Sequence, residues 1–141
     1  MVEIRSRFAV DDAALSALHA RAFGSRDTHT SPWRARLERH SVAWVGAVDG
    51  DELVGFVHAV GDGGAHAFVL DTVVDPAYQR RGIGLALVGR LRGDVASVGV
   101  TWLHVDFEPH LAAFYAACGF RDTSAGLLRL DDDGPETSTS V

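Results

Sequence analysis

The 141-residue sequence contains no lysine and no asparagine, and its only glutamine is Gln79. All 13 basic residues are arginine, so an arginine at any one position says little about function. The absence of lysine excludes a Walker A loop, which needs Gly-Lys followed by serine or threonine. Gln79 is the only side-chain amide in the chain, and its position is therefore more informative than that of any arginine.

Cysteine and long apolar runs are also scarce. The single cysteine, Cys118, excludes an internal disulfide and any zinc site built on cysteine pairs. No apolar run approaches the roughly 20 residues that span a bilayer, and the charged N-terminal segment does not resemble a signal peptide. We therefore expect a soluble cytoplasmic protein with no membrane partner.

The net charge of −6 is concentrated at the C-terminus. Residues 1–130 hold 13 arginines against 15 acidic residues, a balance of −2. A nearly neutral body gives no reason to expect a nucleic-acid partner. With 47% hydrophobic residues, residues 1–130 are expected to form a single domain, and residues 131–141 a disordered acidic tail. The four acidic residues of that tail are Asp131, Asp132, Asp133 and Glu136.

The hydrophobic pattern predicts an α/β chain of the mixed α+β kind, with helices on the faces of a mixed sheet. The predicted elements, in order, are strand 2–8, helix 11–24, a short helix from Ser31-Pro32, strands 42–48 and 53–59, strand 65–74, helix 82–92, strand 100–105, a helix from Pro109 to Gly119 and strand 126–130. Asp49-Gly50 is a strong turn signal between the second and third strands.

Three finer expectations concern caps and burial. Asp11 or Asp12 should cap the first helix. Strand 65–74 is mostly apolar and should be buried on both faces. The buried face of helix 82–92 should carry Leu85, Val88 and Leu91, with Gly93 ending the helix.

The most informative segment is VVDPAYQRRGIGLALV, residues 73–88, in which a strand ends and a helix begins within a glycine-containing loop. Unpartnered backbone N–H groups and the helix dipole at such a start can hold an anion such as a pyrophosphate. Gly82 and Gly84 carry no side chain that would block a close approach. On these residues alone, tight packing of the helix start explains the glycines equally well. A dinucleotide fingerprint is excluded, since Leu87 stands where its third glycine is required.

Two blocks of sequence resemble the signatures of the GCN5-related N-acetyltransferase (GNAT) superfamily. Residues 79–84, QRRGIG, resemble its Gln/Arg-x-x-Gly-x-Gly/Ala signature, and they follow Val74-Asp75-Pro76 as the family's Val-x-Pro precedes it. Residues 114–120, FYAACGF, resemble its second signature, an aromatic residue or leucine, a tyrosine, three residues and Gly-Phe. The separation of the blocks is the usual one, and the resemblance is strong over residues 65–120.

The resemblance implies the GNAT-type acyl-CoA N-acyltransferase fold: a central mixed, mostly antiparallel sheet with a splayed parallel strand pair, here 65–74 and 100–105, and helices on both faces. Acetyl-CoA would be the co-substrate, with its pantetheine arm between the splayed strands, and no metal is needed. The implied cofactor-binding residues are Thr72, Val73, Val74, Gln79, Arg80, Arg81, Gly82, Ile83, Gly84 and Leu85.

The resemblance assigns Tyr115 the role of general acid, which protonates the departing sulfur. A phenol with an ordinary pKa of about 10 keeps its proton at neutral pH. Many family members carry a glutamate or histidine base where this chain has Phe68 and Leu70, which cannot accept a proton. His104, in Leu-His-Val, stands where the ribosomal-protein N-terminal acetyltransferases have the base glutamate of a Leu-Glu-Val triplet. An ordinary half-exposed strand histidine is an equally good explanation of His104.

Acidic residues near the implied site favour a cationic acceptor. Asp71, Asp106 and Glu108 are the candidate substrate-binding residues, and Asp71 and Asp106 are also alternative bases. Glu108 departs from the family, which commonly has a cofactor-contacting asparagine there. Further candidates for an acceptor pocket, for which ordinary packing is the better explanation, are His58, His66, Trp33 and Trp44.

We therefore expect an N-acetyltransferase that transfers an acetyl group from acetyl-CoA to a primary amine, of a small molecule or a peptide, by direct attack in a ternary complex. The alternative is a non-catalytic acyl-CoA-binding or regulatory module of the same fold, which the missing strand base and Glu108 favour. A plain α/β interaction domain is a third interpretation. The acceptor and a homodimeric state stay open.

Overall fold

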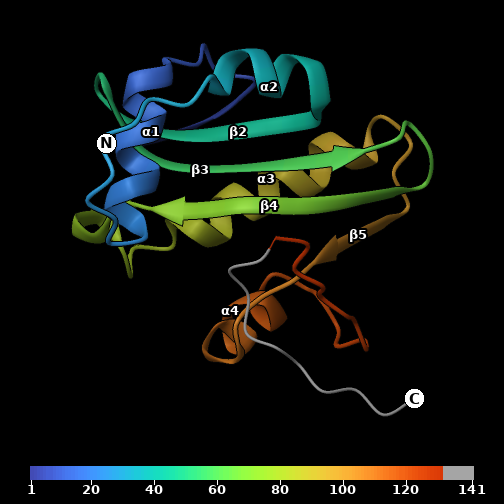
Figure 1. Cartoon of the computed structure of the whole chain (residues 1–141). Coiled ribbons are helices and arrows are strands. Elements are labelled where there is room, and N and C mark those ends of the chain that lie inside the picture. The colour runs from blue at the N-terminus through green and yellow to red at the C-terminus, as the bar shows by residue number, and fades with distance from the viewer. Residues whose placement is uncertain (132–141) are drawn as a thin grey trace.

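The computed structural model describes residues 1–131, so the predicted acidic tail lies outside the described residues except for Asp131. Within them, five strands form one mixed sheet in chain order (Figure 1). Its strands are β1 (Val2–Ser6), β2 (Ser41–Asp49), β3 (Glu52–Gly61), β4 (His66–Val74) and β5 (Trp102–Val105). Neighbours from β1 to β4 are antiparallel, and β4 and β5 are parallel. The predicted mixed, mostly antiparallel sheet is confirmed.

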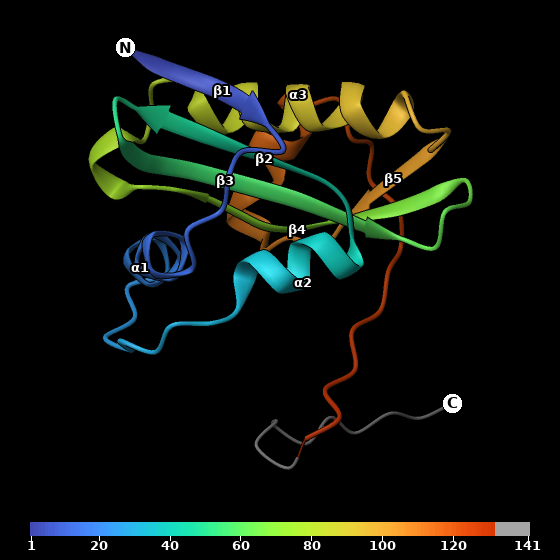
Figure 2. The same cartoon turned by 90° about the horizontal axis from the view of Figure 1, so that it is seen from above.

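Helices cover both faces of this sheet (Figure 2). The α-helices are α1 (Asp12–Ala22), α2 (Trp33–His40), α3 (Ile83–Ala96) and α4 (Ala112–Ala117), and the two short 3₁₀ helices are η1 (Pro76–Tyr78) and η2 (Pro109–Leu111). No helix within residues 1–131 is long and apolar enough to cross a bilayer.

Each face has its own hydrophobic core. On one face, α1 and α2 pack on the sheet through Leu15, Leu18, Trp33, Leu37, Trp44, Phe56 and Val73. On the other face, α3 contributes Ile83, Leu87, Leu91 and Val95, which pack on side chains of β2, β3 and β4. The four-residue spacing of these α3 side chains places them on one helical stripe.

Local signals at the element boundaries agree with the structure in most places. Asp11 caps α1, since its carboxylate accepts a hydrogen bond from the backbone N–H of Ala14 at 2.9 Å. Gly50 has a φ of 61° in the predicted turn between β2 and β3. The predicted start of α2 is displaced by one residue: Pro32, not Ser31, is the N-cap, and it makes no side-chain capping bond.

The parallel pair β4 and β5 is short. Its register runs from His66 opposite Trp102 to Val69 opposite Val105. β5 ends there, while β4 continues through residues 70–74. Within residues 1–131, this second half of β4 therefore has no strand on its β5 side, and the two strands part as the resemblance implies.

Burial of β4 departs from the sequence prediction. Ala67 and Val69 are buried against the α3 core, but Phe68 is 47% exposed and Leu70 is 44% exposed. One face of this half of the strand is therefore solvent-accessible, because α1 and α2 do not extend over it. The long apolar run is a one-sided strand rather than a strand buried on both faces.

Further along, β4 contains a β-bulge. Leu70 pairs with His58 and Val73 with Phe56, so residues 71 and 72 of β4 lie opposite the single residue Val57. Asp71 adopts a φ of 56°, in the left-handed region. The extra residue reverses the alternation of side chains, and Val73 joins the α1–α2 core while Val69 belongs to the α3 core.

Two expectations for α3 are wrong. The helix does not end at Gly93 but continues to Ala96, because Leu91 and Val95 on either side of that glycine are packed on the sheet. Leu85 is not on the buried face: it is 46% exposed, and Leu87 takes its place. Tertiary packing here overrides the local helix-stop signal of glycine.

The C-terminal part of the described chain also differs from the prediction. The predicted helix from Pro109 is divided into η2 and α4, which ends at Ala117. The predicted strand 126–130 does not form, and its leucines, Leu127, Leu128 and Leu130, are strongly exposed. An apolar pattern alone does not make a strand when no neighbouring strand supplies hydrogen-bond partners.

The position of Leu87 in the core predicts the effect of truncating it. We expect Leu87→Ala to lower the free energy of unfolding by about 2–5 kcal/mol, because it removes a fully buried side chain and leaves a cavity. Urea unfolding followed by circular dichroism measures this loss.

The matched control is Leu85→Ala, two residues away on the same helix. Because Leu85 is half-exposed, we expect a change of less than about 1 kcal/mol. An equal loss for both variants would contradict the helix orientation described above.

Candidate active site

The chain segment that joins β4 to α3 is fixed by the buried residue Asp75. One carboxylate oxygen accepts from the backbone N–H of Ala77 at 2.9 Å, and the other accepts from Nε of Arg21 at 3.1 Å. The backbone N–H of Asp75 donates to the carbonyl oxygen of Val54 at 2.8 Å. These bonds anchor the loop to α1 and to the sheet, so that the start of α3 lies at the end of β4.

The loop reaches α3 through two residues in the left-handed region, Arg80 (φ 64°) and Gly82 (φ 79°). Gly82 is the N-cap and has no side-chain cap. A Cβ atom at Gly82 would meet nothing within 4 Å, so the positive φ, rather than crowding, requires glycine. The first backbone N–H groups of a helix have no partner within it, and here they belong to a helix of 14 residues. This start fits an anionic group such as a pyrophosphate.

Gly84 has a different role from Gly82. A Cβ atom there would lie 3.1 Å from the ring of Phe114 on α4. The missing side chain therefore allows close packing of α3 against α4, which is one of the two explanations that the sequence left open for this glycine. Ile83 is buried and Leu85 is exposed, so their backbone N–H groups, rather than their side chains, are the candidate cofactor contacts.

The predicted polar side chains of the loop hold its own backbone. Nε2 of Gln79 donates to the carbonyl oxygen of Val74 at 3.2 Å. Nη2 of Arg81 donates to the carbonyl oxygen of Ala77 at 3.2 Å, and its guanidinium lies 5.0 Å from the ring centroid of Tyr78. Arg80 is exposed. Gln79 and Arg81 thus stabilise the conformation that presents the helix start.

Tyr115 on α4 lies beside Thr72, in the half of β4 that β5 does not pair. Tyr115 is buried, stacks on Phe107 at a centroid distance of 4.9 Å and meets Phe120 edge-on at 5.8 Å. Burial raises the pKa of the Tyr115 hydroxyl, and a hydrogen bond with Thr72 lowers it by less. The phenol therefore carries its proton at neutral pH. The structure brings together these two residues, which the sequence had placed in one site.

On the other side of β4, four side chains form a continuous hydrogen-bonded chain. Oγ of Ser41 lies 2.7 Å from Nδ1 of His58. Nε2 of His58 lies 2.7 Å from one carboxylate oxygen of Asp71, and Nε2 of His19 lies 3.0 Å from the other. We call this set the Ser41–His58–Asp71–His19 chain; it links β2, β3, β4 and α1. Sequence reasoning selected Asp71 as a site residue and His58 as a weak candidate, but missed Ser41 and His19.

The carboxylate at the centre of this chain is ionised at neutral pH. Burial alone would raise the pKa of Asp71, but the hydrogen bonds from His58 and His19 outweigh burial and lower it. An ionised carboxylate only accepts hydrogen bonds, so Nε2 of each histidine donates to it. The sequence feature that could have identified His19 as a site residue is its place on α1, where it follows buried Leu18 and lies one turn after buried Leu15.

A pocket of about 240 Å3 opens at the His19 end of the chain, between α1, α2, the segment joining them and β4. Its charged and aromatic lining residues are His19, Asp27, His29, Trp33, Arg36 and Asp71. Trp33 was a weak acceptor-pocket candidate from the sequence, and it does line this pocket. The lining mixes acidic and basic groups, and the guanidinium of Arg36 lies 4.5 Å from the ring centroid of Trp33.

His104 lies on β5, away from the unpaired half of β4. His104 is exposed on β5, stacks on Phe68 and has Nε2 2.7 Å from Nδ1 of His66. Its register partner Phe68 lies four residues before Thr72, roughly 13 Å along an extended strand. Asp106 and Glu108 follow β5 and are exposed. The structure therefore separates His104 from Thr72, whereas Asp106 and Glu108 are the sequence neighbours of Phe107, whose ring stacks on Tyr115.

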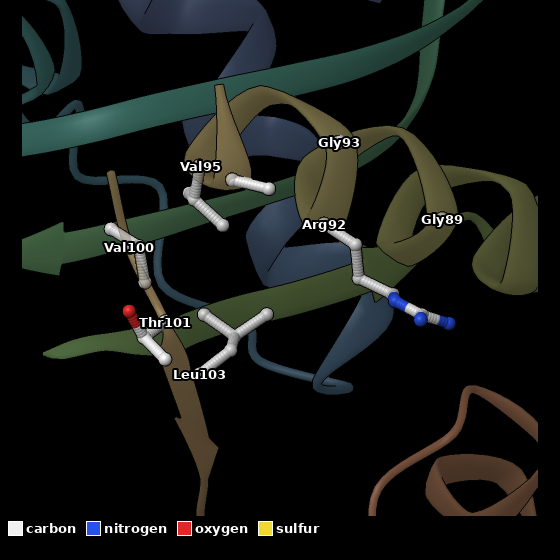
Figure 3. Close-up of a pocket in the computed structure, with 8 residues that line it drawn as sticks. Gly89, Arg92, Gly93, Val95, Val100, Thr101 and Leu103 are labelled. Atoms are coloured by element: carbon white, nitrogen blue, oxygen red, sulfur yellow. The ribbon is translucent and has the colours of Figure 1, made fainter. Parts of the chain in front are cut away.

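A larger pocket, of about 460 Å3, lies between the second half of α3 and β5 (Figure 3). Its lining is mainly apolar and includes Val95, Val100 and Leu103, with Arg92 at its edge. Arg92 donates to the carbonyl oxygen of Cys118 at 2.9 Å, and burial raises the pKa of the Cys118 thiol. None of the predicted catalytic or binding residues lines this pocket, so we place the site at the parted strands instead.

Comparison with known proteins identifies the family and the fold. The sequence profile of the Acetyltransferase (GNAT) family matches residues 13–120, and the chain belongs to that family. Serotonin N-acetyltransferase 2, chloroplastic, of Oryza sativa subsp. japonica is 34% identical over 119 residues, which cover 82% of this chain and 59% of the relative. The chain thus spans less than two thirds of that relative's length.

Solved structures share the fold. A GNAT family acetyltransferase, SP0256 of Streptococcus pneumoniae TIGR4, superimposes with a TM-score of 0.75 at 27% identity, covering 94% of this chain and 100% of that one. An aminoglycoside N-acetyltransferase in complex with CoA superimposes with a TM-score of 0.74 at 17% identity, covering 94% and 95% of the two chains.

The left-handed conformation of Gly82 predicts a specific sensitivity of the loop. We expect Gly82→Ala to destabilise the protein by about 1–2 kcal/mol, because an L-residue is disfavoured at this φ. Thermal or urea unfolding measures the change.

Gly89→Ala is the matched control. Gly89 lies inside α3, and a Cβ atom there would meet nothing within 4 Å. Alanine should therefore raise stability by about 1 kcal/mol through its helix propensity. A stabilising Gly82→Ala would show that the loop does not need the left-handed conformation.

Proposed function

We propose that this protein transfers the acetyl group of acetyl-CoA to a primary amine by direct attack of the amine on the thioester. The observation that carries the proposal is the buried Tyr115 beside Thr72, at the point where β4 and β5 part. Membership of the GNAT family and the helix start at Gly82 support it.

The residues present suit acetyl-CoA as the co-substrate. Backbone N–H groups from Gly82 to Leu85 would bind the pyrophosphate, since they open a helix of 14 residues behind a left-handed N-cap. Backbone groups of Thr72 and Val73 would hydrogen-bond the pantetheine arm along the unpaired edge of β4. The carbonyl oxygen of Val74 already accepts from Gln79, so we expect its contribution to be smaller.

Tyr115 would supply the acid of the reaction. A neutral amine attacks the carbonyl carbon, a C–N bond forms, and the C–S bond breaks as the tetrahedral species collapses. The departing thiolate then takes the hydroxyl proton of Tyr115. Because burial raises the pKa of Tyr115, the proton is present throughout the neutral range.

The acceptor that this site favours is a small molecule or peptide with a cationic amine. The acids Asp27 and Asp71 line the pocket beside β4, where the guanidinium of Arg36 covers the ring of Trp33. Serotonin is named for one relative, and we propose an arylalkylamine of that kind as a first probe. A cytoplasmic location is proposed only from the composition.

A non-catalytic acyl-CoA-binding module is the second candidate. The observation that favours it is the exposure of Phe68 and Leu70 on β4, at positions where neither side chain can accept a proton. Such a module would bind acetyl-CoA at the same loop without releasing free CoA.

The experiment is an acetyl-transfer assay that follows CoA release with serotonin, an aminoglycoside and a peptide with a free N-terminus. We expect Tyr115→Phe to lower kcat by about 10²-fold or more, because the leaving thiolate loses its proton donor. Its acetyl-CoA Kd, measured by calorimetry, should change little.

Tyr78→Phe is the matched control, since Tyr78 is the only other tyrosine. Its hydroxyl donates to Asp49 at 2.7 Å, away from Thr72, and kcat should be retained. Acetyl-CoA binding by the wild type without transfer to any amine would favour the non-catalytic module.

A further inference from the structure

We propose that His19 is the general base that takes the proton of the acceptor amine, and that Asp71 is a positioning residue that orients its imidazole, with His58 and Ser41 behind it. The inference rests on the proposed function and assigns the base that the sequence had sought at His104. The observation that supports this inference is the set of hydrogen bonds in the Ser41–His58–Asp71–His19 chain.

The two imidazoles bound to Asp71 differ in their access to the pocket. His58 is 4% exposed and is enclosed between Ser41 and Asp71, so it cannot meet an acceptor. The His19 side chain is 32% exposed and lines the pocket beside β4. Of the two imidazoles bound to Asp71, only that of His19 is therefore reachable.

The hydrogen bond to Asp71 determines which ring nitrogen of His19 carries a proton. Nε2 of His19 donates to the ionised carboxylate of Asp71, so Nδ1 of the neutral ring carries the lone pair that can accept a proton. A carboxylate on the far nitrogen stabilises the imidazolium that forms. Histidine is the side chain that most often serves as a general base in enzymes.

His19 and Tyr115 contact consecutive residues of β4. Asp71 and Thr72 are consecutive residues of the bulge, and they contact His19 and Tyr115 respectively. The base and the acid therefore flank the same short stretch of the open β4 edge. His104 pairs with the half of β4 that precedes this stretch and hydrogen-bonds His66 instead.

The surroundings of His19 hold its ring in place. Phe23 lies 4.6 Å and Trp33 lies 5.3 Å from it, centroid to centroid. The charged and titratable groups around it are Asp71 on β4, His58 on β3, Arg36 on α2, and Asp27 and His29 on the segment between α1 and α2.

The proton balance is complete without a further reactant. An ammonium group loses one proton to Nδ1 of His19, which releases it to solvent. The amine then attacks the thioester, and its nitrogen sheds a second proton as the amide forms. Tyr115 gives its proton to the CoA thiolate and regains one equivalent to that second proton.

A purely structural role is the competing explanation, since the chain also ties α1 to the sheet. The test therefore needs a readout that a structural tie would not move. We choose His19→Gln, which keeps a hydrogen-bond donor, in the full-length protein with serotonin as the amine and saturating acetyl-CoA.

We expect His19→Gln to lower kcat/KM for serotonin by about 10²-fold or more and to abolish the acidic limb of the pH–rate profile. The acetyl-CoA Kd should be unchanged. In His19→Ala, added imidazole should restore part of the rate. Asp71→Asn should lower kcat with a smaller effect on the KM for serotonin.

His104→Gln is the matched control, an exposed strand histidine on the same sheet. It should retain both rate and acidic limb. If the His19 variants do not fold, a folded Asp71→Asn with unchanged kcat would contradict the assignment. Loss of the acidic limb of the pH–rate profile in His104→Gln would overturn the assignment of His19 as the base but not the proposed function. Survival of that limb in a folded His19→Gln would do the same. A wild type that binds acetyl-CoA but acetylates no amine overturns the proposed function as well.

Discussion

The parting of β4 from β5 after the Val69–Val105 pair is the constraint on which the candidate site depends. Backbone groups buried away from water need hydrogen-bond partners, so an unpaired strand edge survives only where water or a ligand can reach it. The bulge lies within this open stretch and sends consecutive side chains to different neighbours. Asp71 meets His19 and His58, Thr72 meets Tyr115, and Val73 returns to the α1–α2 core.

Much of the fold was predictable because its signals are local. The Asp11 cap, the Asp49-Gly50 turn and the alternation of short apolar segments each depend on a few neighbouring residues. The wrong predictions concern segments whose structure depends on contacts with residues distant in sequence. Gly93 would stop an isolated helix, but Leu91 and Val95 are held on the sheet. The leucines of 126–130 have the pattern of a strand and no strand beside them within residues 1–131.

The candidate site also contains residues that the sequence predicted and residues that it did not. Thr72, Tyr115 and the Gly82 loop lie in or close to two compact sequence blocks, and the resemblance of these blocks to the family's signatures was what placed them in one site. The Ser41–His58–Asp71–His19 chain comes from four elements distant in sequence. In a regular strand Asp71 would share the face of Val69, which lies against α3. Only the bulge turns it towards α1, and a bulge cannot be seen in an alternating apolar pattern.

The left-handed Asp71 links the stability of this region to its chemistry. A non-glycine residue in that conformation costs on the order of 1–3 kcal/mol and persists when its surroundings fix it. Here two imidazoles hold the carboxylate, and the same bonds attach α1, and with it one wall of the acceptor pocket, to the strand that would carry the thioester. The residue that positions the proposed base also attaches α1 to β4, so we expect substitution of Asp71 to change both the reaction rate and the placement of α1.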